Sequence, residues 1–240
     1  MITAISLDLW DTLIESEQGP LESYTLMELE ALRKIIGESK NIEKDEIIEA
    51  YLKLHKYRSV IKPETFAKLL CYLLGINQHD QLLNKAIEAY VEAGYNYFPK
   101  LIAGAVELLE YSKKRGLKVV VVTNTHFTGR TVHKMLENIG IAKYVDFVIS
   151  SADYEVLKPN PRLFKIALDL LKANPWEVIH IGDSCTRDVL GAFSAGMKSI
   201  LYARREKSIE ACKHVPLLGV IKDLREAIPI LKKYTGDGFE

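Results

Sequence analysis

Four short stretches of this 240-residue chain bring together carboxylates, hydroxyls, an amide and a lysine, each soon after apolar residues. They are Asp8–Thr12, Thr123–His126, Lys158–Pro161 and Gly182–Asp188. In an open sheet of parallel strands, the carboxyl ends of the strands meet at one edge, and ligands bind there. If each stretch follows such a strand, the sequence predicts a single site that holds all four.

Three carboxylates of these stretches, those of Asp8, Asp183 and Asp188, would approach one another at that edge. Two carboxylates about 5 Å apart repel by roughly 3 kcal/mol at an effective dielectric of 20. Three together are tolerable when a proton or a cation lies between them, and a site of oxygen ligands alone favours a hard ion such as Mg²⁺. The acids therefore predict a magnesium site.

Hydrogen-bond donors and positive charge lie opposite the acids. Thr123, the backbone amide of Asn124 and Lys158 would form a cradle for a tetrahedral anion, with phosphate the obvious candidate. Asp8 would then stand between the metal and the anion, placed for in-line attack on phosphorus. This arrangement predicts phosphoryl chemistry.

The elements that must position these residues follow from hydrophobic periodicity. From residue 98 onward, apolar β-branched runs alternate with segments whose apolar residues recur at helical spacing. We expect strands at 2–9, 118–122, 147–150, 177–181, 198–202 and 219–221, and helices at 104–115, 128–139, 161–172, 187–195 and 224–233. Strands separated by helices favour right-handed crossovers and a parallel sheet covered on both faces. The predicted fold class is α/β, with a doubly wound, Rossmann-like parallel sheet.

The stretch 15–97 has a different pattern. Apolar residues recur there at helical spacing over 21–36, 44–57, 63–74 and 80–93, and no segment reads as a strand. We therefore expect an α/β core formed by 1–14 and 98–240, with an inserted all-helical cap at 15–97. Four basic residues of the cap, Lys53, Lys56, Arg58 and Lys62, are interpreted as a solvated helix face, with the alternative that one of them reaches a substrate carboxylate or a second phosphate.

The composition excludes several classes of protein. The chain is 48% hydrophobic and 27% charged, which is typical of a globular protein, and its 32 basic and 32 acidic residues cancel. A neutral chain has no global field that attracts nucleic acid or an anionic membrane. The N-terminus lacks a basic leader, and no apolar run approaches the ~20 residues of a membrane span. We expect a cytoplasmic monomer or homodimer whose partner is a small-molecule substrate.

The cysteines carry little signal. Cys71, Cys185 and Cys212 are odd in number and far apart in the sequence, and they form no CxxC pair. This pattern indicates neither a disulfide framework nor a zinc site. We expect three reduced thiols.

The ordered motifs together resemble the haloacid dehalogenase superfamily. They are Asp8-x-x-x-Thr12-Leu13, Thr123-Asn124 at the end of a strand, the Lys158-Pro159 pair, and Gly182-Asp183-x-x-x-x-Asp188. The resemblance covers nearly the whole chain, and a helical insertion just after the first motif is similar to the C1 cap of that family.

The resemblance implies a role for each matching position. Asp8 would be the nucleophile that forms an aspartyl intermediate, Thr123 and the Asn124 amide would bind the phosphoryl group, and Lys158 would neutralise charge. Asp183 and Asp188, with Asp8 and the backbone carbonyl of Trp10, would hold Mg²⁺.

One position departs from the pattern of the family's phosphatases. They usually carry a second Asp two residues after the nucleophile, which acts as general acid and base, whereas this chain has Trp10 there and Asp11 one residue later. General acid–base help is typically worth roughly 10²–10⁴-fold in rate. Asp11 is therefore a candidate for the missing general acid and base, and His126 is a second candidate. Neither is needed if the leaving group is good enough to depart unaided. Alternatively, Asp11 is a turn residue and Trp10 packs against the cap.

Two other functions stay open. The dehalogenase branch of the superfamily also lacks the second Asp and has an aromatic residue there, so Trp10 is consistent with a metal-independent 2-haloacid dehalogenase. A catalytically weak phosphate-binding protein is the other possibility. Because Asp183 and Asp188 are both present, phosphoryl chemistry is favoured over both.

Overall fold

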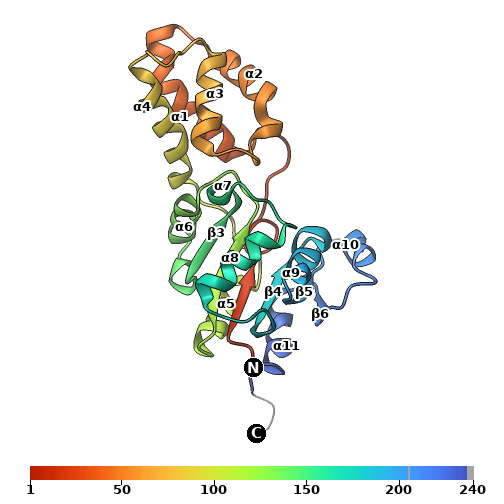
Figure 1. The fold of residues 1–240 in the computed structure, drawn as a ribbon. Helices are drawn as coiled ribbons and strands as arrows, with labels where there is room; N and C mark the ends of the chain where they lie inside the picture. The colour runs from red at the N-terminus through yellow and green to blue at the C-terminus, as the bar shows by residue number, and fades with distance from the viewer. Residues whose placement is uncertain (205, 237–240) are drawn as a thin grey trace.

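A parallel sheet of six strands forms the centre of the molecule in the computed structural model, which describes residues 1–204 and 206–236 (Figure 1). The strands are β1 (Ala4–Leu7), β2 (Lys118–Thr123), β3 (Phe147–Ser150), β4 (Val178–Gly182), β5 (Lys198–Tyr202) and β6 (Gly219–Ile221). Their spatial order is β3-β2-β1-β4-β5-β6, with every pair parallel. β1 is therefore the point from which the chain winds both ways, as the doubly wound prediction requires.

Helices cover both faces of this sheet, because alternate strand residues point to opposite sides. One face packs on α5 (Ala105–Lys114), α6 (Gly129–Asn138) and α11 (Ala227–Lys232). The other packs on α8 (Pro161–Leu171) and α9 (Gly191–Ser194). Two short helices, α7 (Ser151–Tyr154) and α10 (Glu206–Ala211), complete the core. The predicted α/β class is confirmed.

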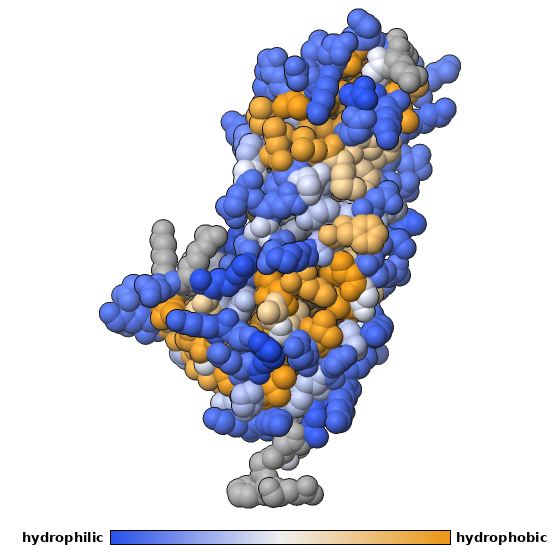
Figure 2. Space-filling model, turned by 180° about the vertical axis from the view of Figure 1, so that it is seen from behind, coloured by the Kyte–Doolittle hydropathy of each residue, from blue (hydrophilic) through white to orange (hydrophobic). Residues whose placement is uncertain are grey.

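A group of four helices follows β1 and lies beyond the sheet, at one end of the elongated molecule (Figure 1). They are α1 (Ser23–Lys40), α2 (Lys44–Leu54), α3 (Pro63–Leu73) and α4 (Leu82–Ala93). Their buried side chains, among them Phe66 and Tyr90, form a hydrophobic cluster that contains none of the described strand residues. Figure 2 shows apolar side chains on the surface of this helical group and of the core, with a more polar region between them. We call residues 15–97 the helical cap.

Single helical turns link these elements. They are 3₁₀ turns at His55–Tyr57, Gly94–Asn96, Ala142–Tyr144, Pro175–Glu177 and Leu224–Glu226, and a π-helical segment at Cys185–Leu190. The helix expected at 187–195 is thus a π-helical segment that continues into α9. The expected strand 2–9 is also shorter, because the chain turns at Leu9, whose carbonyl accepts from the backbone N–H groups of Leu13 and Ile14.

The expectation of three reduced thiols is wrong for two of them. Cys185 and Cys212 form a disulfide across a sequence separation of 27 residues, with their Cα atoms 5.4 Å apart. The sequence spacing could not show this pairing, because the fold brings α10 alongside the π-helical segment. Cys71 is unpaired and buried in the cap.

The last four residues of the expected core, 237–240, lie outside the described residues. Within the described part, no helix has the length and apolar character needed to cross a membrane.

Candidate active site

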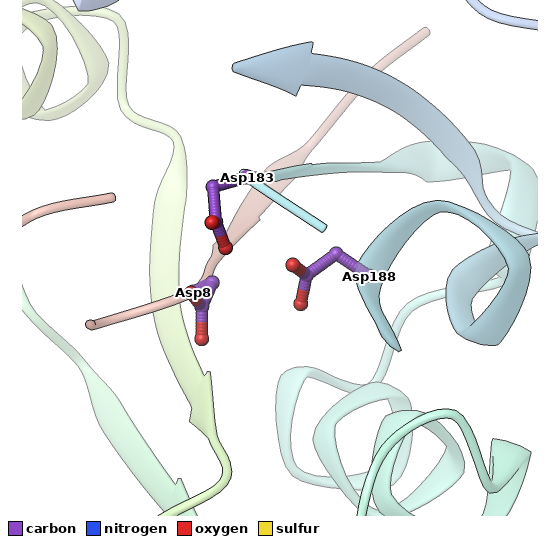
Figure 3. A group of neighbouring side chains, drawn as sticks. All are labelled: Asp8, Asp183 and Asp188. Carbon is purple, nitrogen blue, oxygen red and sulfur yellow. The ribbon is translucent and has the colours of Figure 1, made fainter. Parts of the chain in front are cut away.

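Asp8, Asp183 and Asp188 converge at the carboxyl ends of β1 and β4 (Figure 3). Each offers a carboxylate oxygen, and these oxygens all lie within 4.8 Å of one another. The convergence follows from the sheet register, since Leu7 pairs with Ile181 and the two strands therefore end together. The sequence prediction that these acids gather at one sheet edge agrees with this geometry.

Lys158 is the cation of this acidic cluster. Its ammonium donates to Asp8 Oδ1 and to Asp188 Oδ1, at 2.6 Å in both cases, and to the Val122 carbonyl at 2.8 Å. The lysine is 4% exposed, so these bonds lie out of water. An ammonium has three donors, and all three are used within the protein.

The side chain of Asn124 fixes the backbone of Lys158. Its amide nitrogen donates to the Lys158 carbonyl at 3.0 Å, and its Oδ1 accepts from the Lys158 backbone N–H at 2.7 Å. The motif resemblance implies a role only for the backbone amide of Asn124. The side-chain contact spans 34 residues, and no local signal predicts it.

Two threonines face the nucleophile candidate differently. Thr12 donates its hydroxyl to Asp8 Oδ2 at 3.2 Å. Thr123 is fully buried, and its hydroxyl has no hydrogen-bond partner. A buried hydroxyl without a partner costs free energy, so it indicates a group that a ligand satisfies.

The electrostatics of the cluster are uneven. Burial disfavours the Lys158 ammonium, but the carboxylates of Asp188 and Asp8 outweigh this and raise its pKa. Burial likewise opposes ionisation of Asp188, yet Lys158 and His180 hold the pKa of that carboxyl well below its usual range. Asp183 has only the Arg187 guanidinium, at 3.8 Å, and burial together with Asp8 and Asp188 raises its pKa to about 7. One lysine therefore does not balance three acids.

The residues present fit a divalent hard cation. Asp183 Oδ1 is buried and has no hydrogen-bond partner, and it shares the cluster with Asp8 and Asp188. Carboxylate oxygens are the ligands that Mg²⁺ prefers. A cation would satisfy the unpaired oxygen and supply the charge that Lys158 cannot.

A family model described as haloacid dehalogenase-like hydrolase matches residues 7–202. The chain belongs to this family. The resemblance inferred from the motifs is thus confirmed, and the protein is a hydrolase.

Individual relatives of this hydrolase differ in how much they share with it. Haloacid dehalogenase-like hydrolase domain-containing protein 3 of Bos taurus is 37% identical over 138 residues, 57% of this chain and 54% of the relative. The chain thus matches about half the length of that relative. Glyceraldehyde 3-phosphate phosphatase of Methanopyrus kandleri is 28% identical over 211 residues, 85% of each chain. A solved 2-haloacid dehalogenase from Pseudomonas syringae covers 98% of this chain and 100% of its own, with a TM-score of 0.71 and 22% identity, and supports the fold.

Trp10 of this hydrolase lies in an aromatic cluster between core and cap. Its ring centroid is 5.5 Å from that of Tyr24 in α1, 6.4 Å from Tyr97 and 6.5 Å from Phe127. The interpretation that Trp10 packs against the cap agrees with these contacts. Its backbone carbonyl as a metal ligand stays a prediction.

Asp11 is turned toward a cavity at the rim of the site. Its Oδ2 accepts from the Ser16 hydroxyl at 2.6 Å, and its Oδ1 accepts from the Arg204 guanidinium at 2.7 Å. Asp11, Asp183 and Arg204 line this cavity of about 290 Å³, together with Glu15, Ser16 and Gln18. Arg204 was missed by sequence reasoning, because it comes 193 residues after Asp11 and carries no motif.

His126 contacts buried charges of the cap and does not reach the acidic cluster. Its Nε2 lies 3.1 Å from Glu28 Oε1 and 2.5 Å from the Arg58 guanidinium, which also pairs with Glu28. Arg58 is 7% exposed, so its interpretation as part of a solvated face is wrong. Packing against α1 and His126 buries this arginine, which helical spacing could not reveal. Burial and Arg58 lower the pKa of His126 to about 4.

His180, on β4, is a further residue that the sequence analysis missed. It is fully buried, its Nδ1 lies 2.9 Å from the Ser6 hydroxyl, and its Nε2 lies 3.5 Å from Asp188 Oδ1. A histidine inside a strand reads as an ordinary core residue. Here its Nε2 makes no hydrogen bond, but it lies against Asp188 and helps to keep the pKa of that carboxyl low.

Proposed function

We propose that this hydrolase is a Mg²⁺-dependent phosphatase that acts on a small phosphorylated molecule through an aspartyl-phosphate at Asp8. The observation that carries the proposal is the cluster of Asp8, Asp183 and Asp188, in which Lys158 is the buried cation and contacts only Asp8 and Asp188 of the three acids. The unpartnered hydroxyl of Thr123 adds a donor for a phosphoryl oxygen. The name of the Methanopyrus relative, a phosphatase matched along 85% of both chains, supports the same reaction class.

The metal site of this proposal consists of Asp8, Asp183, Asp188 and the carbonyl of Trp10. When bound there, Mg²⁺ would offset the carboxylate charge and polarise a phosphoryl oxygen. A metal-independent dehalogenase has no need of these acids, because attack on carbon is hindered by negative charge nearby.

In the first step, a carboxylate oxygen of Asp8 forms a bond to phosphorus, and the bond between phosphorus and the leaving oxygen breaks. The leaving group takes the electron pair of that bond. Lys158 lies 2.6 Å from Asp8 and offsets the charge that gathers in the transition state. Thr123 and the Asn124 amide orient the phosphoryl group. In the second step, water attacks phosphorus, releases inorganic phosphate with the proton passing to solvent, and restores the Asp8 carboxylate.

Hydrolysis of acetyl phosphate and p-nitrophenyl phosphate with and without Mg²⁺ tests this function. We expect activity that EDTA removes and Mg²⁺ restores, loss of turnover in Asp8→Asn, and full activity in the control Asp169→Asn, an exposed acid of α8. Activity that survives EDTA or Asp8→Asn would contradict the proposal. Halide release from 2-chloropropionate in EDTA would identify a dehalogenase instead, and phosphate binding without any turnover would identify a binding protein.

A further inference from the structure

The side chains around Asp8 that could donate a proton to the leaving oxygen are already engaged in packing, hydrogen bonds or ion pairs with other residues. At the second position after the nucleophile stands Trp10, whose ring is packed among Tyr24, Tyr97 and Phe127. An indole N–H is a hydrogen-bond donor but does not act as an acid near neutral pH. This position therefore supplies no proton.

Asp11 comes next in the chain, but both of its oxygens are occupied. Ser16 donates to one and Arg204 to the other, at 2.6 and 2.7 Å. Asp11 has a φ of 60°, in the left-handed region, and its amide donates to the Ile14 carbonyl. The tight turn over 11–14 thus fixes the direction of the carboxylate. Reaching a leaving group would require breaking the Arg204 ion pair and the Ser16 bond together.

The remaining donors near the nucleophile are committed as well. The three ammonium protons of Lys158 go to Asp8, Asp188 and Val122. The Thr12 hydroxyl donates to Asp8 itself, and His126 is held by buried charges of the cap. Asp183, as a ligand of the proposed metal, would be ionised. Within residues 1–204 and 206–236, none of these groups offers a proton to a leaving oxygen.

From this we infer the substrate class: phosphorylated molecules whose leaving group departs without being protonated, namely acyl phosphates, aryl or enol phosphates and phosphoanhydrides, and not alkyl phosphates. The inference rests on the proposed function. When Asp8 displaces a carboxylate from an acyl phosphate, the electron pair of the P–O bond stays on an oxygen whose acid has a pKa of about 4, so no proton is required. An alkoxide, whose conjugate acid is about as weak as water, leaves poorly without one.

A series of leaving groups tests the inference. The value of kcat/KM with Mg²⁺ is measured for acetyl phosphate, p-nitrophenyl phosphate, phenyl phosphate and glycerol phosphate, since this constant reports the first, bond-breaking step. We expect it to fall by at least about 10³-fold from p-nitrophenyl to glycerol phosphate, because an acid would supply roughly 10²–10⁴-fold. Glycerol phosphate turned over within tenfold of p-nitrophenyl phosphate would overturn the inference and leave the proposed function intact. Absence of turnover with all four substrates would overturn both.

Three variants sharpen the test. Asp11→Asn should change kcat/KM by the same factor for the aryl and the alkyl substrates. A loss of kcat/KM for glycerol phosphate alone would show that Asp11 is the acid and would contradict the inference. Trp10→Asp should raise the ratio of kcat/KM for the alkyl substrate to kcat/KM for the aryl substrates by at least tenfold. Trp10→Phe, which keeps an aromatic ring in the cluster, should leave this ratio where it is. If Trp10→Asp fails to fold, the wild-type series and Asp11→Asn decide the question alone.

Discussion

The ammonium of Lys158 and the carboxylate of Asp8 share a buried hydrogen bond of 2.6 Å, although 150 residues separate them in the chain. The same ammonium also donates a hydrogen bond to Asp188, again at 2.6 Å. One cation thus compensates two buried acids, while Asp183 has only the Arg187 guanidinium, at 3.8 Å. The site is therefore electrostatically incomplete, and this imbalance makes its response to substitution and to metal predictable.

Lys158→Met should destabilise the metal-free protein strongly. Removing one partner of a buried ion pair typically costs about 3–5 kcal/mol, because the other charge stays buried without compensation. We expect a loss of this size in the free energy of unfolding by urea in EDTA, partly recovered on adding Mg²⁺. Lys165→Met, at an exposed position of α8, serves as the control. Equal free energies of unfolding for Lys158→Met and wild type in EDTA would show that the ion pairs of Lys158 do not stabilise the protein.

Asp183→Asn should stabilise the metal-free protein at alkaline pH. Burial, with Asp8 and Asp188, raises the pKa of Asp183 to about 7, so the folded state keeps a proton that the unfolded chain loses near pH 4. Stability from this group therefore falls as pH rises from about 4 to about 7. The amide removes that loss, and we expect a melting temperature a few degrees higher at pH 8 in EDTA.

The same variant should lose the stabilisation that Mg²⁺ gives to the wild type. Thermal unfolding at pH 8, with EDTA and with Mg²⁺, measures both effects, and Asp169→Asn is the matched control. A lower melting temperature for Asp183→Asn than for wild type in EDTA would contradict the charge imbalance. So would an increase in melting temperature on adding Mg²⁺ that is equally large in both proteins.

Much of this fold and site follows from local sequence patterns. The β-branched run 118–122 and the glycines that follow several helices predicted the alternation of strands and helices, and parallel strands bring Asp8, Asp183 and Asp188 to one edge. Arg58 and Arg204 were not recognisable. Each is a residue type that is normally exposed, and only contacts with elements distant in the chain decide that one is buried and the other holds Asp11.

His126 should make the stability of the protein depend on pH below neutrality. Burial and the Arg58 charge lower its pKa to about 4, against about 6.5 in an unfolded chain. Between these values the unfolded state binds the proton and the folded state does not, so stability is lost as pH falls from about 6.5 toward 4. The shift corresponds to roughly 3 kcal/mol at 1.36 kcal/mol per unit.

Urea unfolding of wild type and His126→Gln at several values between pH 5 and 7 measures this contribution. Glu28, Glu22 and Arg58 face the histidine, and all three are unchanged in the proteins compared. We expect a shallower pH dependence in His126→Gln than in wild type or in the control His133→Gln, which alters an exposed histidine of α6. Parallel curves for all three proteins would contradict a buried neutral His126.

Cys212→Ser should lower the free energy of unfolding by about 2–4 kcal/mol, the usual contribution of a disulfide that closes a loop of this length. The bond also ties α10 to the π-helical segment, where Cys185 lies between Asp183 and Asp188, so we expect weaker Mg²⁺ binding in the variant. Urea unfolding and Mg²⁺ titration measure the two effects. Dithiothreitol should bring the wild type to the same stability as the variant and leave the variant unchanged. Three free thiols in the unfolded, unreduced wild type, where one is expected, would show that the bond does not form.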